Sequence, residues 1–171
     1  HFLSQDNVNQ AIIFTATKRL ADKLSDDLYH KDIKASALHG DMTQNSRTRT
    51  INRFKKNGLK VLVATDIASR WLDISNLSCV INFDIPWDSE TYVHRIWRTG
   101  RAWKDWLAIS FSTPQDKQKI NDIEKLIWKK IEIIQDDSYK NEVIPKSKFK
   151  LTKTEFKKAK IKQKRYYWKK K

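Results

Sequence analysis

Five short apolar runs in the first 111 residues constrain the fold of this chain most strongly. They read AIIFT (11–15), ASALH (35–39), VLVAT (61–65), CVINF (79–83) and LAISF (107–111). Most of these runs are continuous rather than alternating, which is typical of strands covered on both faces of a parallel sheet. We therefore predict a central, mostly parallel β-sheet.

Segments with helical spacing separate these runs. Leu20, Leu24 and Leu28 recur every four residues behind Thr17, a residue type that caps helices. Three more helices are expected: 43–57 with Thr43 as cap and Gly58 as stop, 88–96 behind Asp88, and 113–127 behind Thr113 and Pro114. Alternating strands and helices indicate right-handed crossovers and a three-layer α/β fold, in which ligands bind beyond the carboxyl ends of the strands.

The net charge of +15 is unevenly distributed. Residues 140–171 hold fourteen Lys and Arg residues against Glu142 and Glu155, a net charge of +12, which leaves +3 for the first 139 residues. We expect one globular domain over residues 1–135 and a flexible basic extension over 136–171. A balanced domain with a basic tail is typical of polyanion binding, and the alternative is a solvated tail that only aids solubility.

Cysteine content and hydropathy indicate a cytoplasmic location. Cys79 is the only cysteine, so an internal disulfide framework is excluded, and no run of 18 apolar residues is present that would span a membrane.

An arginine cluster, Arg95, Arg98 and Arg101, suggests an anion site. A helix ending near Trp97 would let Arg98 and Arg101 project together, and guanidinium groups suit phosphate oxygens. The alternative is surface arginines paired with neighbouring acids: Asp84, Asp88 or Glu90.

Two other strand ends are followed by polar residues. Thr65 and Asp66 suit contacts with a phosphate and a ribose hydroxyl, although Asp66 could equally cap the next turn. Gly40 suits a tight turn, and Arg47 and Arg49 lie near the positive end of the following helix, where they could bind phosphates or form a solvated face.

Taken together, IIFTATKR, LHGDMTQNSRTRTINRFK, VLVATDIASRWLDI and VINFDIPWDSETYVHRIWRTGRAW closely resemble the C-terminal RecA-like domain of DEAD-box ATP-dependent RNA helicases. The resemblance covers about residues 1–135. It implies an α/β fold, a three-layer RecA-like domain with a mostly parallel central sheet, followed by the Lys-rich tail.

The resemblance also implies roles for individual residues. Arg98 and Arg101 match the catalytic arginines that reach the ATP γ-phosphate, Asp73 matches the carboxylate that holds the ATP ribose, and His94 matches the residue that couples this motif to the other domain. Seven residues match nucleic-acid-binding positions: Thr15, Gly40, Asp41, Gln44, Arg47, Thr65 and Arg70.

The implied activity couples ATP binding and hydrolysis to local unwinding of RNA duplexes. The 171-residue sequence contains neither a GxxxxGK[ST] loop nor a DEAD sequence. Binding of ATP would therefore also need the absent first RecA-like domain, which would hold Mg²⁺. Expected partners are RNA, the N-terminal RecA-like domain and ribonucleoproteins reached through the tail, with no membrane. The chain alone is expected to be inactive. Alternatives are a non-catalytic RNA-binding module with decayed motifs, and half of a DNA-directed helicase.

Tryptophan stands where the family pattern has glycine. The chain has 3 Gly and 7 Trp. Glycine is the family residue at Trp71 and Trp97 and commonly at three more positions: Trp103, Trp106 and Trp128. Large residues there would cost about 1–3 kcal/mol per site through overpacking. Either the indoles add stacking surface for bases, or the pattern reflects a decoding artefact or a degenerate gene.

Overall fold

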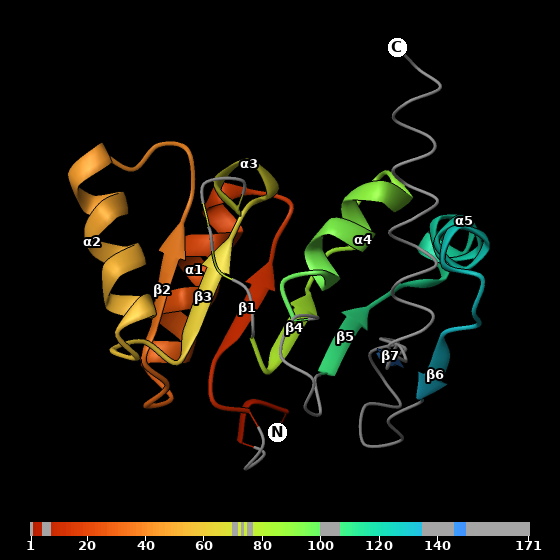
Figure 1. Ribbon diagram of the computed structural model, residues 1–171, viewed down its shortest axis with the longest axis horizontal. Helices are drawn as coiled ribbons and strands as arrows, with labels where there is room; N and C mark the ends of the chain where they lie inside the picture. Colours follow the sequence, from red (N-terminus) through yellow and green to blue (C-terminus); the bar gives the residue numbers. More distant parts are fainter. Residues whose placement is uncertain are drawn as a thin grey trace.

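The five apolar runs form five adjacent parallel strands in the computed structural model (Figure 1), which describes residues 2–4, 8–69, 72, 74, 77–99, 107–134 and 146–149. The strands are β1 (Ala11–Phe14), β2 (Ala35–Leu38), β3 (Val61–Ala64), β4 (Cys79–Asn82) and β5 (Leu107–Phe111). The order across the sheet is β2-β3-β1-β4-β5-β7-β6. The prediction of a mostly parallel sheet is confirmed.

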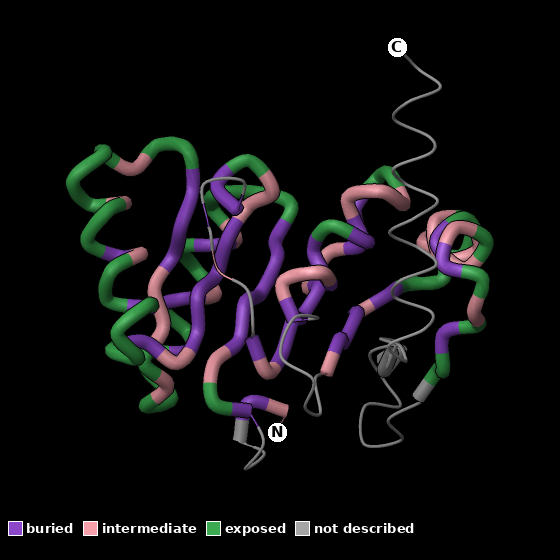
Figure 2. Tube along the Cα trace, in the orientation of Figure 1, coloured by how far each residue is buried: buried purple, intermediate pink, exposed green. Residues whose placement is uncertain are grey.

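Strand β1 lies between β3 and β4, which explains its uninterrupted hydrophobicity. Ile12 is in register with Leu62 of β3 and Val80 of β4. All four β1 residues are buried, and Figure 2 shows the same for the neighbouring strands. A strand that is covered on both faces cannot alternate apolar and polar residues.

Helices cover both faces of the sheet, so the fold has the three layers expected. On one face Ala21 and Leu28 of α1 (Lys18–Tyr29) pack on Ile13. The other face is covered by α2 (Gln44–Lys55), α3 (Asp66–Ser69), α4 (Ser89–Ile96) and α5 (Lys117–Ile127). Phe54 of α2, for example, packs on Ile12.

The predicted helix starts are confirmed. Thr17, Thr43 and Asp88 each accept a hydrogen bond from the backbone N–H three residues later. Thr113 precedes a 3₁₀ turn, η2 (Pro114–Asp116), and α5 follows directly. A further 3₁₀ turn, η1, spans Phe2–Ser4.

The end of α2 differs from its prediction. The left-handed residue is Asn57, with φ 57°, not Gly58. The Asn57 N–H donates to the Phe54 carbonyl (3.0 Å) and the Gly58 N–H to the Arg53 carbonyl (2.8 Å), which is a Schellman motif. A Cβ on Gly58 would lie 3.1 Å from the Arg53 oxygen, so Gly58 permits a close approach rather than a positive φ.

Two strands were not predicted. β6 (Glu132–Ile134) and β7 (Lys146–Phe149) pair antiparallel with each other, and β7 also pairs antiparallel with β5. β7 belongs to the expected basic extension, the rest of which lies outside the described residues. The boundary at residue 135 therefore stays a prediction. Among the described helices, none is both long and apolar enough to cross a membrane.

Cys79 lies at the start of β4 and is fully buried. Burial raises the pKa of its thiol to about 12, because the interior of the sheet does not stabilise a thiolate.

Trp128, immediately after α5, has the left-handed backbone of a glycine position. Its φ is 59° and its side chain is 74% exposed. A left-handed L-residue costs about 1–2 kcal/mol, and little packing is lost with an exposed ring. We expect Trp128→Gly to raise the free energy of unfolding by about 1 kcal/mol, since the greater freedom of glycine in the unfolded chain offsets part of the gain.

Urea denaturation would measure this change. Trp87→Gly is the matched control, because Trp87 is also exposed but is not among the described residues with positive φ. A destabilised Trp128→Gly variant would contradict the expectation.

Candidate functional site

Three loops meet at the carboxyl edge of β1, β2 and β3. Hydrogen bonds extend the sheet one residue past the strand ends: the Thr15 N–H donates to Ala64 (3.0 Å) and the Thr65 N–H donates to Leu38 (3.2 Å). The predicted nucleic-acid residues Thr15, Gly40 and Thr65 thus come from adjacent loops of one edge.

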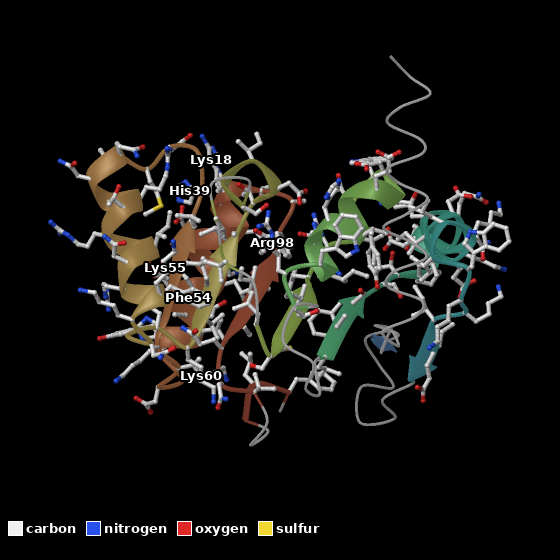
Figure 3. All side chains as sticks on the ribbon, viewed as in Figure 1. Lys18, His39, Phe54, Lys55, Lys60 and Arg98 are labelled. Carbon is white, nitrogen blue, oxygen red and sulfur yellow. The ribbon has the colours of Figure 1, made fainter. Side chains whose placement is uncertain are left out.

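Lys18 and Asp41 join two of these loops. The Lys18 ammonium forms an ion pair with the Asp41 carboxylate across 23 residues of sequence, and both side chains are more than half exposed. Figure 3 shows Lys18 at the carboxyl edge, near His39. The hydrogen bond from Lys18 holds the pKa of Asp41 below its usual range. Asp41 therefore anchors a cation at this edge.

His39 supports the turn that contains Gly40. Its Nε2 lies 2.8 Å from the Asp22 carboxylate of α1, and the residue is 9% exposed. A Cβ on Gly40 would meet nothing within 4 Å. The surface beside Gly40 is open enough for a ligand backbone to approach.

Gln44 and Arg47 form a polar pair in the first turn of α2. The Arg47 guanidinium donates to the Gln44 side-chain oxygen (2.9 Å) and to the Met42 carbonyl (3.4 Å). Gln44 is exposed and Arg47 is half-buried. Because α2 follows β2, the pair lies near the carboxyl end of that strand.

The two threonines are less accessible. Thr15 is fully buried and its hydroxyl donates to the Thr17 carbonyl (3.3 Å), whereas Thr65 is half-buried. Their expected contacts with nucleic acid stay predictions.

Arg95 is a structural cation. Its guanidinium donates twice to the Asp66 carboxylate (2.7 Å each), and also to the Asn82 side-chain oxygen (3.0 Å) and the Asp84 carbonyl (2.7 Å). It is 3% exposed. Arg95 is thus not one of three arginines aimed at an anion, nor does it pair with a carboxylate of Asp84, Asp88 or Glu90. Asp66 begins α3 and its carboxylate accepts two hydrogen bonds from Arg95, so it does more than cap the turn, and its suggested ribose contact stays a prediction.

Arg98 follows the end of α4, as expected. Trp97 is the C-cap of α4, and the Arg98 guanidinium donates to the carbonyls of Leu72 (2.6 Å) and Ser69 (3.2 Å). These contacts hold Arg98 against the segment that follows α3. The side chain is half-buried and lies beside α4 (Figure 3).

His94 and Trp97 lie one turn apart on α4. Their rings meet edge to face at 5.2 Å between centroids, and His94 is exposed. Trp97 has φ −66°, an ordinary helical value that any residue adopts. Its backbone conformation, unlike that of Trp128, does not require glycine.

The cap of α4 gives a pH-dependent prediction. Partial burial opposes ionisation of Asp88, but hydrogen bonds from the Thr91 amide and hydroxyl hold the pKa below its usual value. The stabilisation is therefore complete above the ordinary carboxyl pKa and is lost as the pH falls through the folded-state pKa. We expect Asp88→Ala to lower the free energy of unfolding by about 1 kcal/mol at neutral pH, and by less in acid.

Urea denaturation at neutral pH and near pH 3 would measure the difference. Asp88→Asn keeps an acceptor without a charge and is the control. An Asp88→Ala loss that stays constant with pH would contradict this account of the cap.

Comparison with known proteins shows the family to which the chain belongs. Residues 1–103 match the helicase conserved C-terminal domain. The chain belongs to this helicase family. It is 48% identical over 126 residues to the DEAD-box ATP-dependent RNA helicase RhpA of Helicobacter pylori (strain B128), covering 74% of this chain and 26% of RhpA.

Solved structures of this helicase family share the fold. The E. coli DEAD-box protein SrmB, bound to regulator of ribonuclease activity A, matches with a TM-score of 0.75 and 34% identity over 81% of each chain. A DEAD-box protein from Methanococcus jannaschii matches with a TM-score of 0.68 and 38% identity, over 75% of this chain and 36% of that one. The predicted RecA-like fold and the DEAD-box resemblance are confirmed.

Part of the predicted helicase site lies outside the described residues. This applies to Arg70, Asp73 and Arg101, and to three of the tryptophans, Trp71, Trp103 and Trp106. Their expected roles stay predictions. The described part of the site comprises the carboxyl-edge residues, His94 and Arg98.

Sequence reasoning missed two cation contacts of this helicase domain. Lys18 lies in the quoted segment TATKR, but its partner Asp41 is brought to it only by the fold. Arg95 and Asp66 are 29 residues apart and pair across the α3–α4 contact. The sequence signal available was the polar character of the residues at these strand ends. It indicates that they lie at the carboxyl edge of the sheet, but not which residues form ion pairs with each other.

Proposed function

We propose that this chain is the second RecA-like half of an ATP-dependent RNA helicase that unwinds short duplexes locally. The observation that supports this most is the placement of Lys18, of Thr65 and of the first turn of α2, with Gln44 and Arg47, directly after three adjacent strands at one edge of the sheet. Such an edge is where ligands bind in open α/β sheets. The identity to RhpA, which is named as ATP-dependent, supports the same reaction.

The carboxyl edge would bind the sugar-phosphate backbone of one RNA strand. Lys18 and Arg47 supply positive charge, and Gln44 supplies an amide. A carboxylate repels phosphate, so Asp41 would act by holding Lys18 rather than by touching the strand. Contacts of this kind position a strand without reading its bases, and 2′-hydroxyl contacts would distinguish RNA from DNA.

Arg98 would act on the nucleotide, with Arg101 beside it and Asp73 on the ribose. The half-buried Arg98 guanidinium fits this role, because hydrogen bonds to the carbonyl oxygens of Leu72 and Ser69 fix its position. ATP supplies a phosphoryl group whose developing charge a guanidinium stabilises. Mg²⁺ would be held by the first domain.

The missing first domain is an essential partner in this proposal. The chain spans only 26% of the length of RhpA, so the activity of the whole enzyme requires the rest. His94, exposed on α4, would contact that domain. We also propose a cytoplasmic location and attachment to ribonucleoproteins through the basic extension.

Reconstitution tests the proposal. The first RecA-like domain of a DEAD-box relative is joined to this chain, and ATP hydrolysis is measured with RNA, with DNA and without nucleic acid. RNA-stimulated hydrolysis is the expected result. RNA binding without hydrolysis would favour the non-catalytic module, and equal stimulation by DNA would favour a DNA-directed enzyme.

A further inference from the structure

Helix α2 carries positive charge that nearby acids do not balance. Residues 42–65 contain no Asp or Glu, but they contain six basic residues: Arg47, Arg49, Arg53, Lys55, Lys56 and Lys60. Residues 18–34, which contain α1, instead mix five Lys and Arg with Asp22, Asp26, Asp27 and Asp32. The charge of α2 is therefore a local feature of this helix.

The outward side of α2 forms a shallow groove, here called the α2 basic groove, with a volume of about 420 Å³. Its lining residues are all exposed: Asn45, Thr48, Arg49, Asn52, Arg53 and Lys56. Their spacing of three and four places them on one helix face. Figure 3 shows the side chains of α2 projecting away from the sheet, while Phe54 on the opposite side is buried.

The cations of the groove differ from several other lysines in having no carboxylate partner among the residues that the structure describes. Lys18, Lys119, Lys125 and Lys130 each pair with an acid. Within the described ranges, no ion pair joins Arg49, Arg53 or Lys56 to one. Like charges this close repel each other, so the groove favours an anionic partner.

The spacing of the groove fits a phosphate chain better than a single anion. Arg49 and Arg53 are one turn apart, a rise of about 6 Å, which is comparable to the separation of successive phosphates along one strand. Asn45, Thr48 and Asn52 add amide and hydroxyl groups that can donate to phosphate or sugar oxygens.

Along α2 the groove begins next to residues of the proposed RNA-binding edge. Gln44 and Arg47 in the first turn of α2 belong to the proposed RNA-binding edge, and the groove begins at Asn45. A nucleic-acid strand leaving the edge would therefore meet the groove next.

We propose that the α2 basic groove binds the backbone of RNA flanking the strand held at the carboxyl edge. This inference rests on the proposed RNA-binding function and extends its footprint along α2. The groove would keep the domain attached to RNA beside the site of unwinding, independently of the first domain.

The test measures RNA affinity of the full chain against salt, using an RNA hairpin with a single-stranded overhang. The variant Arg49→Gln/Arg53→Gln/Lys56→Gln removes three phosphate contacts, so the negative slope of log K against log salt should become shallower by about 2. Arg19→Gln/Lys23→Gln/Lys31→Gln, on and just after α1, removes the same charge and should change the slope by well under one unit. Circular dichroism checks that both fold.

Acetylation of lysines in the unaltered chain gives a second readout. RNA should protect Lys56 from acetylation, whereas Lys23 should stay reactive. This measurement needs no variant, so it holds even if the triple variant does not fold.

Several results would overturn the inference. The first is an unchanged salt slope in the α2 variant, and the second is acetylation of Lys56 that RNA does not reduce. The third is that the α2 variant loses binding to phosphatidylserine vesicles but keeps its binding to RNA. Arg47→Gln separates the two proposals. If Arg47→Gln weakens RNA binding but the α2 variant does not, only the proposal for the α2 basic groove is wrong. If neither variant weakens RNA binding, the proposal for the RNA-binding edge is wrong as well.

Discussion

Replacing Arg98 by alanine is expected to lower kcat for RNA-stimulated ATP hydrolysis by about 10³–10⁵-fold in the enzyme reconstituted with its first domain. A guanidinium that contacts the transferring phosphoryl group stabilises charge that develops only in the transition state. The RNA affinity should stay nearly unchanged, because Arg98 is held by the carbonyls of Ser69 and Leu72 at the end of α3.

Arg19→Ala is the matched control, because Arg19 is an exposed arginine of α1 on the other face of the sheet. It should leave kcat unchanged. Thermal unfolding of both variants distinguishes a catalytic defect from a loss of stability caused by removing the hydrogen bonds to the carbonyls. An Arg98→Ala enzyme within about tenfold of the unaltered rate would rule out the arginine-finger role.

Replacing Arg95 by alanine is expected to reduce the free energy of unfolding by about 3–5 kcal/mol, a large share of the 5–15 kcal/mol of a typical domain. The guanidinium satisfies Asp66, the fully buried Asn82 side chain and the Asp84 carbonyl. Its removal leaves these acceptors without their donor in a mostly buried place.

Urea denaturation of the isolated chain measures this loss, with Arg19→Ala again as the control. The double variant Arg95→Met/Asp66→Leu should recover part of the stability, since both partners of the ion pair are then apolar. A loss below about 1 kcal/mol for Arg95→Ala would mean that the pair behaves like a surface ion pair.

The sheet and its helices could be predicted because their signals are local. Continuous apolar runs located all five parallel strands, and Thr17, Thr43 and Asp88 marked helix starts through hydrogen bonds that reach only three residues. Strands β6 and β7 could not be predicted in the same way. The β7 segment KSKF is half lysine, and its antiparallel pairing with β5 depends on a distant partner.

The site could be predicted only as a set of residues. Strand ends converge at one edge by topology, so Gly40, Arg47 and Thr65 were expected together. The contacts of individual charged side chains could be identified only from the folded structure. Arg95 and Arg98 are three residues apart, yet one is buried on Asp66 while the other reaches backbone carbonyls.

The tryptophans likewise differ in backbone conformation, which only the structure shows. Trp97 has an ordinary helical backbone, but Trp128 has the left-handed conformation that glycine adopts freely. The sequence pattern treated these two positions alike. The structure assigns a backbone reason for glycine to Trp128 alone among the tryptophans it describes.

The single thiol of the chain gives a means to observe opening of the sheet. Because Cys79 lies in a central strand and its pKa is raised to about 12, maleimide reagents have neither access nor a thiolate while the strand is paired. The rate of its labelling therefore reports rare opening of β4. A cysteine introduced on the surface of α1, for example by Lys23→Cys, would label first and could carry a dye for measuring approach of the first domain.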